Sequence, residues 1–455
     1  LQSLLNNDDA RWKSTLQGQM VDYLVRGKRH LLIVLPTGGG KTLAMALPSL
    51  IEPEGITVVV VPFVALMEDL KIRLSNYGVL WGTYGDLELE KKRVILVSLE
   101  VAADENFVRF CGNVQGCGLL KRIILDEAHH FLMSPIFRPA FLKFRHLVSA
   151  AVPLALCTAT MPPKYEQDLW TALKVSPRTT ITLREDSTAR PEISYRVTKV
   201  DPDDVEAKVV EYVNSVTLRE EERGIIYCNT IAAAQHLAKA MGVEAYISNL
   251  TLAKKNEIMR KWVGGEQPWL IGTSAIGVGI DYPHVCYVVH AEPSYTLIDY
   301  AQETGRAGRD GKPSVAQMIC SGPPLCSREN YTGYGGYDEM VEWVELLDAC
   351  RRYHMGQFLD GIGRTCGSTP NGEFCTYCAG LLVRCLLFVS YSSLCSLQKI
   401  PPRYKMPVPI SFTAPLHPGV KRTFEEVQEE DAFYDDGPTL EHSDCKCFDH
   451  FVVIY

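Results

Sequence analysis

Residues 31–47 read LLIVLPTGGGKTLAMAL, an apolar run, a glycine-rich turn and a helix-forming run in direct succession. A strand that leads through glycines into a helix N-terminus aims backbone N–H groups and the helix dipole at phosphate groups. In such an arrangement Lys41 reaches the β- and γ-phosphates of a nucleotide and Thr42 ligates Mg²⁺. Leu35 stands where the generic pattern has its first glycine. The stretch predicts a nucleotide-binding loop made of Thr37, Gly38, Gly39, Gly40, Lys41 and Thr42.

Short apolar runs alternate with helix-forming stretches on the C-terminal side of this loop. Continuous apolar runs of this length fit strands buried on both faces, as in a parallel sheet covered by helices. A turn-rich stretch at 186–192 separates a first series from a second. We therefore predict two α/β units, with strands at 31–35, 57–61, 94–97, 122–125 and 154–157 in the first and at 224–227, 245–247, 269–272, 287–290 and 315–320 in the second.

An acidic group follows the predicted strand at 122–125 and reads Asp126-Glu127-Ala128-His129. It emerges at the carboxyl end of the strand, where α/β sheets bind ligands. We expect Asp126 to hold Mg²⁺ and Glu127 to orient or deprotonate the attacking water. His129 is expected to couple this site to the facing unit.

Two arginines lie three residues apart in the second unit, within the run QETGRAGRDG at 302–311. In a glycine-broken turn, Arg306 and Arg309 can reach the γ-phosphate of a nucleotide held by the first unit. Such arginines change the rate of phosphoryl transfer by roughly 10³–10⁵. We expect Gln302 to help place them, which makes this run the second half of an ATPase site.

The runs PTGGGK, DEAH and QETGRAGRDG resemble motifs of the RecQ branch of superfamily 2 helicases. Their order along the chain is also that of the family. The resemblance covers about residues 19–378, and its further segments are VVVVPFVALMED at 58–69, VSLE at 97–100, TAT at 158–160, Arg190-Pro191, GIIYCNT at 224–230, residues 246–250 and GTSAIGVGID at 272–281.

The resemblance implies a fold of two tandem RecA-like parallel-sheet domains, at 1–186 and 187–345. A small helical zinc-binding module at 346–380 would follow, then an apolar helix and an acidic tail of low order at 381–455. The sequence opens on Leu1 and only 77 residues follow Cys378, without a winged-helix or HRDC pattern. We therefore expect a fragment of a RecQ-like protein, resembling the fungal ones.

The resemblance also implies residues that contact the nucleotide and DNA. Gln19 is similar to the glutamine that reads adenine, although a surface position on a helix and base stacking by Arg11 or Trp12 are open alternatives. Asp281 would lie in the nucleotide site. Ser98 and Thr273 would contact the phosphates of a single strand.

An aromatic-rich loop that senses DNA follows the acidic motif in the family. Here it reads HFLMSPIFRP at 130–139, one residue shorter than usual and without tryptophan. Phe131, Phe137 and Arg138 are the candidates for DNA contact, since stacking of a base on an aromatic ring contributes ~1–3 kcal/mol. The alternative is that both phenylalanines are core residues.

Four cysteines follow the second α/β unit: Cys350, Cys366, Cys375 and Cys378. Four thiolates in one short helical segment can close a tetrahedral Zn²⁺ site, and their spacing resembles the RecQ zinc module. Cys385 or Cys395 could replace one of these ligands, and four buried unliganded thiols are the remaining alternative.

The composition restricts the class of protein without deciding its ligand. A net charge of −8 does not indicate a nucleic-acid binder, although a local basic groove is compatible with it. Fifteen cysteines without a signal peptide favour a reduced intracellular compartment. The apolar stretch at 380–397 contains Arg384 and is a poor membrane span, so we expect no membrane partner.

Together these patterns predict an ATP-dependent 3′-to-5′ DNA helicase that moves on single-stranded DNA and unwinds duplex DNA. Its cofactors would be ATP, Mg²⁺ and Zn²⁺, and its family implies recombination and repair in the nucleus. Two alternatives stay open. One is an RNA helicase of the DEAH type, and the other is a DNA-stimulated ATPase or DNA-binding module that no longer unwinds.

Overall fold

Each of the ten apolar runs predicted as a strand forms one in the computed structural model of the chain. The structure describes residues 8–27, 29–36, 38–62, 64–130, 152–185, 187–277, 282–324 and 335–383, with Gln2, Phe144 and Leu147. Residues 1–381 form one compact unit. The fold described below is that of this unit, and the predicted apolar helix and acidic tail lie almost wholly outside the described residues.

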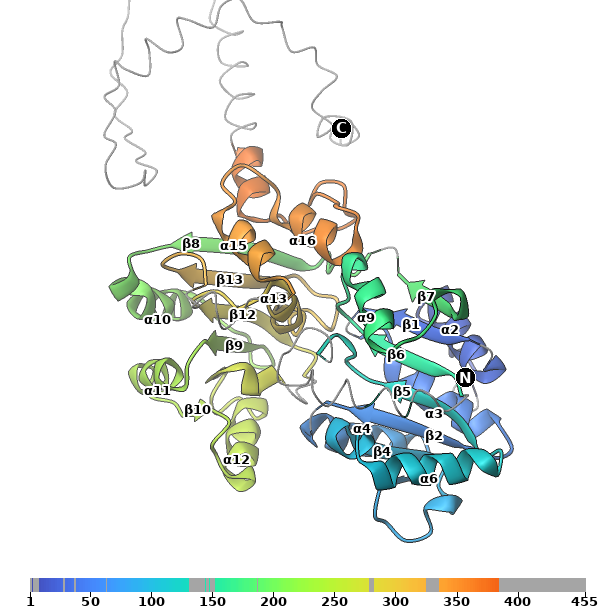
Figure 1. The fold of residues 1–455 in the computed structure, drawn as a ribbon. Coiled ribbons are helices and arrows are strands. Elements are labelled where there is room, and N and C mark those ends of the chain that lie inside the picture. The colour runs from blue at the N-terminus through green and yellow to red at the C-terminus, as the bar shows by residue number, and fades with distance from the viewer. Residues whose placement is uncertain are drawn as a thin grey trace, which may run out of the picture. The chain divides into compact units, whose positions relative to one another are not determined.

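Seven parallel strands form the first sheet, in the order β3-β4-β2-β5-β6-β1-β7 (Figure 1). Its strands are β1 (His30–Val34), β2 (Ile56–Val61), β3 (Trp81–Thr83), β4 (Val94–Ser98), β5 (Leu120–Leu125), β6 (Leu154–Thr158) and β7 (Thr180–Arg184). Apolar side chains of α2 (Thr15–Arg26), α3 (Lys41–Ile51) and α4 (Val64–Asn76) cover one face of the sheet. Those of α5 (Leu99–Ala102), α6 (Glu105–Gly116) and α9 (Glu166–Ala172) cover the other.

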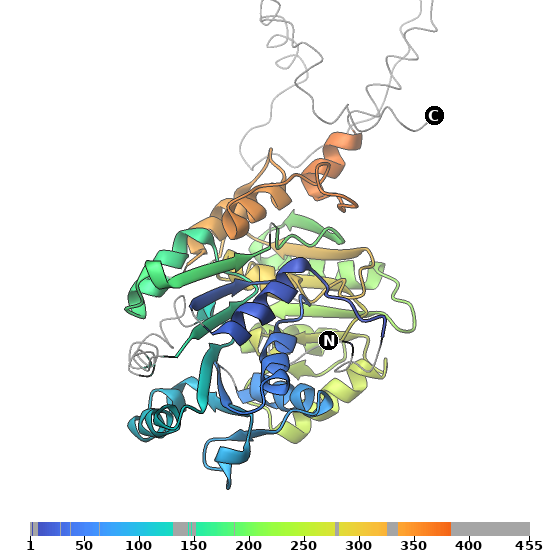
Figure 2. The ribbon, with the colours of Figure 1, turned by 90° about the vertical axis from the view of Figure 1, so that its right-hand side faces the viewer.

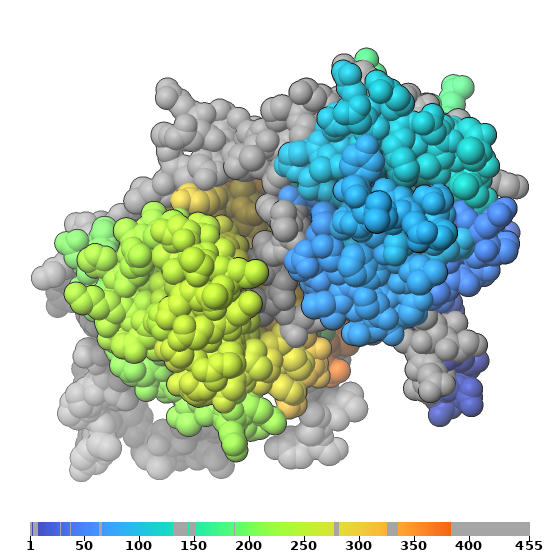
Figure 3. Space-filling view, turned by 90° about the horizontal axis from the view of Figure 1, so that it is seen from below, coloured from blue at the N-terminus to red at the C-terminus, as the bar shows by residue number. Residues whose placement is uncertain are grey.

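Six parallel strands form the second sheet, in the order β10-β11-β9-β12-β13-β8. They are β8 (Ile193–Lys199), β9 (Arg223–Cys228), β10 (Ala245–Tyr246), β11 (Trp269–Gly272), β12 (Val285–Ala291) and β13 (Ser314–Cys320). Helices α10 (Val205–Ser215) and α11 (Ile231–Ala240) pack on one face, and α12 (Leu252–Val263) and α13 (Leu297–Thr304) on the other. Figure 3 shows the outer surface over residues 64–116 in blue to cyan and over α11 and α12 in green to yellow-green. The two sheets are tandem RecA-like domains, as the sequence predicts.

Short 3₁₀ turns complete the two domains. They are Leu89–Lys91, Pro163–Tyr165, Pro177–Thr179, Pro202–Asp204 and Ser274–Gly277.

A helical segment follows the second sheet and lies against its edge strand β8. It contains α15 (Tyr337–Glu345) and α16 (Arg351–Asp360), and both views show these helices in orange beside β8 (Figures 1 and 2). The Ser194 hydroxyl of β8 donates to the Phe374 carbonyl at 2.7 Å, and the Val197 N–H donates to the Thr376 hydroxyl at 3.2 Å. We call residues 346–380 the cysteine module. In the described part of the chain no helix is both long and apolar enough to cross a membrane.

Candidate nucleotide and metal sites

The glycine-rich loop after β1 has the backbone geometry that its glycines predict. Gly38 and Gly40 take positive φ values of 81° and 84°, which side chains other than glycine rarely adopt. Gly40 is the N-cap of α3, so the helix begins at Lys41. The Lys41 ammonium group donates to the Leu35 carbonyl at 3.1 Å, which keeps it over the loop. Thr37 lies outside the described residues.

Gln17, and not the predicted Gln19, is the glutamine of α2 that faces this loop. A Cβ atom at Gly40 would come within 2.0 Å of Gln17 Nε2, so the Gln17 amide lies directly against the loop backbone. Its Oε1 accepts a hydrogen bond from the Lys13 N–H at 2.9 Å. Gln19 is exposed to solvent. A signal was present in the sequence, because Gln17 shares the buried face of α2 with Met20 and Leu24.

The carboxylates of Asp126 and Glu127 lie at the carboxyl end of β5, as predicted. Burial raises the pKa of Asp126 to about 7, with a further contribution from the negative charge of Glu127, while Lys41 acts in the opposite direction. In the described structure Asp126 Oδ1 and Glu127 Oε2 are buried without a hydrogen-bond partner. Glu127 has a φ of 45°, a strained value for a side chain of its kind. Buried carboxylate oxygens near Lys41 fit Mg²⁺, which prefers oxygen ligands, and Glu127 Oε2 also lies 3.5 Å from His129 Nδ1.

His129 links the first sheet to the second through hydrogen bonds on both ring nitrogens. Its Nδ1 lies 2.8 Å from the Thr158 hydroxyl, and its Nε2 lies 2.7 Å from the Gln302 amide nitrogen of α13. Gln302 also donates to the Thr160 hydroxyl at 3.0 Å. Burial lowers the pKa of His129 to about 3, and the positive charge of Lys41 adds to this shift. The imidazole is therefore neutral, accepts from Gln302 and donates to Thr158.

Replacing His129 by glutamine should flatten the pH dependence of stability on the acidic side of neutrality. The pKa of His129 is about 3 in the folded chain, against about 6.5 in an unfolded one, so the unfolded state binds more protons between these values. The contribution of His129 to the free energy of unfolding is complete above pH 6.5. Below pH 6.5 it decreases as the pH is lowered, by about 1.4 kcal/mol per pH unit, until the pH reaches the folded-state pKa of about 3. Thermal unfolding of both proteins at pH 7.5 and pH 5 measures the difference, and equal slopes would contradict it.

The turn that carries the predicted arginines follows α13, and we call residues 305–309 the arginine turn. Arg306 and Arg309 lie close enough to Tyr227 of β9 for their charges to oppose the rise of its pKa to about 12, a rise caused by burial. Positive charges on Lys41 and Arg73, both in the first domain, lower the pKa of Asp126. The structure thus brings Gln302 to the first domain and places both arginines near β9.

Arg190, in the segment between the two sheets, holds the backbone of the arginine turn. Its guanidinium donates to the Gly305 carbonyl at 2.6 Å and to the Ala307 carbonyl at 2.7 Å. It also forms an ion pair with Glu192 at 2.6 Å. The sequence places Arg190 between the domains, but this contact spans more than a hundred residues and has no local signature.

Two of the predicted DNA-contact residues stand at the carboxyl ends of strands. Ser98 follows the buried part of β4 and caps α5, its hydroxyl accepting from the Val101 N–H at 3.4 Å. Thr273 follows β11, and its hydroxyl accepts from the Ala275 N–H at 3.4 Å. The other predicted contacts, Phe131, Phe137 and Arg138, lie outside the described residues, as does Asp281.

The four predicted cysteines of the cysteine module come together around one point. Cys350, Cys366, Cys375 and Cys378 have their sulfur atoms within 4.8 Å of one another. The Cys350 sulfur lies 3.6 Å from that of Cys366 and 3.9 Å from that of Cys375. Tetrahedral ligands at the Zn–S distance of about 2.3 Å are about 3.8 Å apart, so the set fits Zn²⁺. Cys385 and Cys395 lie outside the described residues.

Hydrogen bonds among the four sulfurs shift their pKa values in opposite directions. They lower the pKa of Cys350 to about 7 and lower that of Cys375, while they raise the pKa values of Cys366 and Cys378. Thiolates are the form that binds zinc. The fit to a structural zinc site therefore rests on the geometry of the four sulfur atoms.

Two family models match the two domains. Residues 14–169 match the DEAD/DEAH box helicase model, and residues 206–311 match the helicase conserved C-terminal domain. The chain is 32% identical over 343 residues to the ATP-dependent DNA helicase RecQ of Synechocystis, and the match covers 68% of each protein. It is 28% identical over 340 residues to the rat ATP-dependent DNA helicase Q5, covering 68% of this chain and 35% of that protein. The chain spans about a third of the length of that relative.

Solved structures share the fold at low sequence identity. The yeast Dbp5 protein bound to RNA and ADP BeF3 is 18% identical with a TM-score of 0.54, over 72% of this chain and 87% of that one. The helicase MrfA bound to DNA is 17% identical with a TM-score of 0.56, over 71% of this chain and 48% of that one. At these identities the similarity concerns the fold alone.

Proposed function

We propose that this chain, which belongs to the RecQ family of DEAD/DEAH-box helicases, hydrolyses ATP to move along single-stranded DNA from 3′ to 5′ and to unwind duplex DNA. One observation carries the proposal. Gln302, on the helix that leads into the arginine turn, contacts both His129 of the acidic motif and Thr160, two residues after β6. A residue of the second domain therefore contacts the group that follows the catalytic acids, as a motor ATPase requires.

The site residues would divide the chemistry between the two domains. The loop amides and Lys41 would hold the phosphates, and the buried Gln17 amide of α2 would support the loop backbone at Gly40. Asp126 and Thr42 would hold Mg²⁺, which supplies positive charge to the phosphate oxygens when it is bound. Glu127 would orient the attacking water and accept its proton.

The second domain would complete the site only when the domains close on ATP. Arg306 and Arg309 would then contact the γ-phosphate. The neutral His129 would transmit the conformational change at the nucleotide site to α13 through its hydrogen bond with Gln302. Each cycle would open and close the two sheets around a tracked strand. The polarity of movement, and a role in recombination and repair in the nucleus, come from the family.

The choice of DNA over RNA rests on the relatives and on the cysteine module. The curated relatives described above are named as DNA helicases, and the four-cysteine set lies where the family has its zinc module. Similarity to the RNA-bound structure concerns the fold alone. ATP hydrolysis stimulated only by RNA would contradict this choice.

Replacing Lys41 by alanine should lower kcat for DNA-stimulated ATP hydrolysis by at least about a hundredfold, because the reacting phosphates lose their main fixed charge. The exposed Lys91 provides the matched control, and Lys91→Ala should leave the rate unchanged. ATPase activity and displacement of a strand from a 3′-tailed duplex are measured on the same samples. Intact hydrolysis in Lys41→Ala would refute the proposal, and hydrolysis by the wild type without displacement would restrict it to a DNA-stimulated ATPase.

A further inference from the structure

Two adjacent buried arginines begin α16, directly after the zinc-ligand candidate Cys350, and they have different partners. Arg351 donates to the carbonyls of Trp343 and Leu346, both at the end of α15 or just beyond it. Arg352 donates instead to the carbonyls of Arg190 at 2.6 Å and Ile193 at 2.7 Å. Arg352 therefore ties the cysteine module to the segment between the two sheets, with a further bond to the Glu373 carbonyl of the module at 3.1 Å, whereas Arg351 ties the module to α15 and the residue that follows it.

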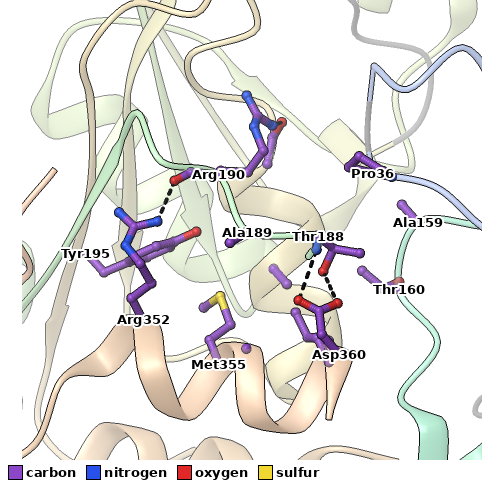
Figure 4. Close-up of a pocket in the computed structure, with 14 residues that line it drawn as sticks. Pro36, Ala159, Thr160, Thr188, Ala189, Arg190, Tyr195, Arg352, Met355 and Asp360 are labelled. Carbon is purple, nitrogen blue, oxygen red and sulfur yellow. Dashed lines mark hydrogen bonds between the residues drawn. The ribbon is translucent and has the colours of Figure 1, made fainter. Parts of the chain in front are cut away.

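The other end of α16 holds the same segment. Asp360 accepts from the Thr188 N–H at 2.9 Å and from the Thr188 hydroxyl at 2.7 Å. Asp360 is only 6% exposed, so both hydrogen bonds are shielded from water. Figure 4 shows Arg352 reaching the Arg190 backbone and Asp360 reaching Thr188. We call residues 187–192 the linker, and α16 holds it at two points.

The linker in turn holds the arginine turn. The backbone of Arg190 accepts from Arg352, and its side chain donates to the carbonyls of Gly305 and Ala307, on either side of Arg306. The ion pair with Glu192 fixes the orientation of this side chain. An unbroken series of hydrogen bonds therefore runs from α16 through the linker to the peptide groups that flank Arg306.

A cavity of about 40 Å³ lies at the centre of these contacts (Figure 4). Its lining includes Pro36 of the phosphate-binding loop, Thr160 after β6, Arg190 of the linker, Gly305 of the arginine turn and Asp360. A volume of this size holds a small number of water molecules rather than a ligand. Elements of the nucleotide site and of the cysteine module thus meet around one small void.

We propose that the cysteine module positions the arginine turn for ATP hydrolysis, with Arg352 as the positioning residue and Arg190 as the intermediate. This inference rests on the proposed ATPase function. The hydrogen bonds of Arg352 and Arg190 described above go to backbone carbonyls and to Glu192. They fix the backbone from which Arg306 projects, and misplacement of a reacting group by about 1 Å costs about a hundredfold in rate.

Arg352→Gln should lower kcat for DNA-stimulated ATP hydrolysis by about tenfold to a hundredfold, with KM for ATP changed less than about twofold. Arg351→Gln is the matched control, because it removes an equally buried arginine whose partners lie outside the linker. It should destabilise the module similarly and leave kcat of the folded protein near the wild-type value. Zinc content and the melting temperature are measured for both variants. Equal losses of kcat in the two would overturn the inference.

The role of Arg190 as the connection between Arg352 and the arginine turn is tested by combining variants. Arg190→Lys alone should lower kcat about as much as Arg352→Gln, and the double variant should lose little more than either, because both act through one backbone turn. If the fold-decreases in kcat of the two single variants multiplied in the double variant, Arg190 and Arg352 would act independently, and the inference would be contradicted. If Arg352→Gln fails to fold, Thr188→Val tests the second contact, since it removes only the hydroxyl that donates to Asp360.

A measurement without ATP separates this inference from the proposed function. Deuterium exchange of peptides that cover residues 303–311 should be faster in Arg352→Gln than in the wild type, and unchanged in Arg351→Gln. This result would support the structural coupling even if the wild type showed no ATPase activity. Unchanged exchange in Arg352→Gln would overturn the coupling whatever the activity of the wild type.

Discussion

Alanine at Arg306 or at Arg309 is expected to lower kcat for DNA-stimulated ATP hydrolysis by about 10³-fold or more, the largest kinetic effect among these variants. Each guanidinium would stabilise charge that develops on the γ-phosphate only as the bond to the leaving group breaks. Such an interaction contributes more to the transition state than to the bound ground state, so KM for ATP should change much less than kcat. Steady-state ATPase assays at saturating single-stranded DNA measure both constants.

Lys312→Ala is the matched control for the arginine variants. Lys312 follows the same turn, is half exposed and pairs with Asp310 at 3.5 Å, so its loss should leave kcat unchanged. Arg306→Lys and Arg309→Lys keep the charge but lose the planar fork, and we expect them to recover only part of the rate. A rise in KM with kcat unchanged in Arg306→Ala and Arg309→Ala would show that these arginines bind ATP without acting on its hydrolysis.

The central strands of both sheets could be predicted from the sequence, and several edge strands could not. β2 is buried along its whole length, so its residues are almost uniformly apolar. β3, β7 and β8 lie at sheet edges, where one side of the strand has no strand neighbour. β8 begins with Ile193 and ends with Lys199, and its exposed half carries polar side chains. A search for continuous apolar runs therefore misses these strands.

The residues of the candidate site also fall into those that the sequence predicts and those that it does not. Lys41, the acidic motif and the four cysteines could be found because each set has its own spacing in the sequence. Gln17 is marked in the sequence only by its place on the apolar face of α2, and the loop that it contacts lies more than twenty residues away, so the spacing argument that selected Gln19 did not find it. Arg352 contacts backbone carbonyls, and Asp360 contacts the N–H and hydroxyl of Thr188, so neither contact has a characteristic spacing in the sequence. Residues of this kind become visible only when the fold brings distant segments together.

Removing zinc should unfold the cysteine module, the largest effect on stability expected here. Structural zinc sites contribute apparent binding free energies of about 10–16 kcal/mol, far more than one buried side chain. Cys375→Ser keeps the size of this fully buried residue but replaces a thiolate ligand with a hydroxyl. Zinc per chain should fall to nearly zero, and limited proteolysis should cut within residues 346–380. Cys111→Ser, at a buried cysteine of α6, should retain the metal.

Loss of zinc should also lower ATP hydrolysis, because α16 begins at Arg351, next to the candidate ligand Cys350, and ends at Asp360. Without the metal to fix that first turn, Arg352 would no longer hold the carbonyls of Arg190 and Ile193, and the arginine turn would lose its support. We therefore expect kcat in Cys375→Ser to fall at least as far as in Arg352→Gln, while ADP affinity at the first domain stays within about threefold, since the loop and Lys41 are untouched. Fluorescent ADP titration and ATPase assays on the same preparation measure the two quantities. If the zinc-free protein hydrolysed ATP at the wild-type rate, zinc would have no effect on the arginine turn, and this prediction would be contradicted.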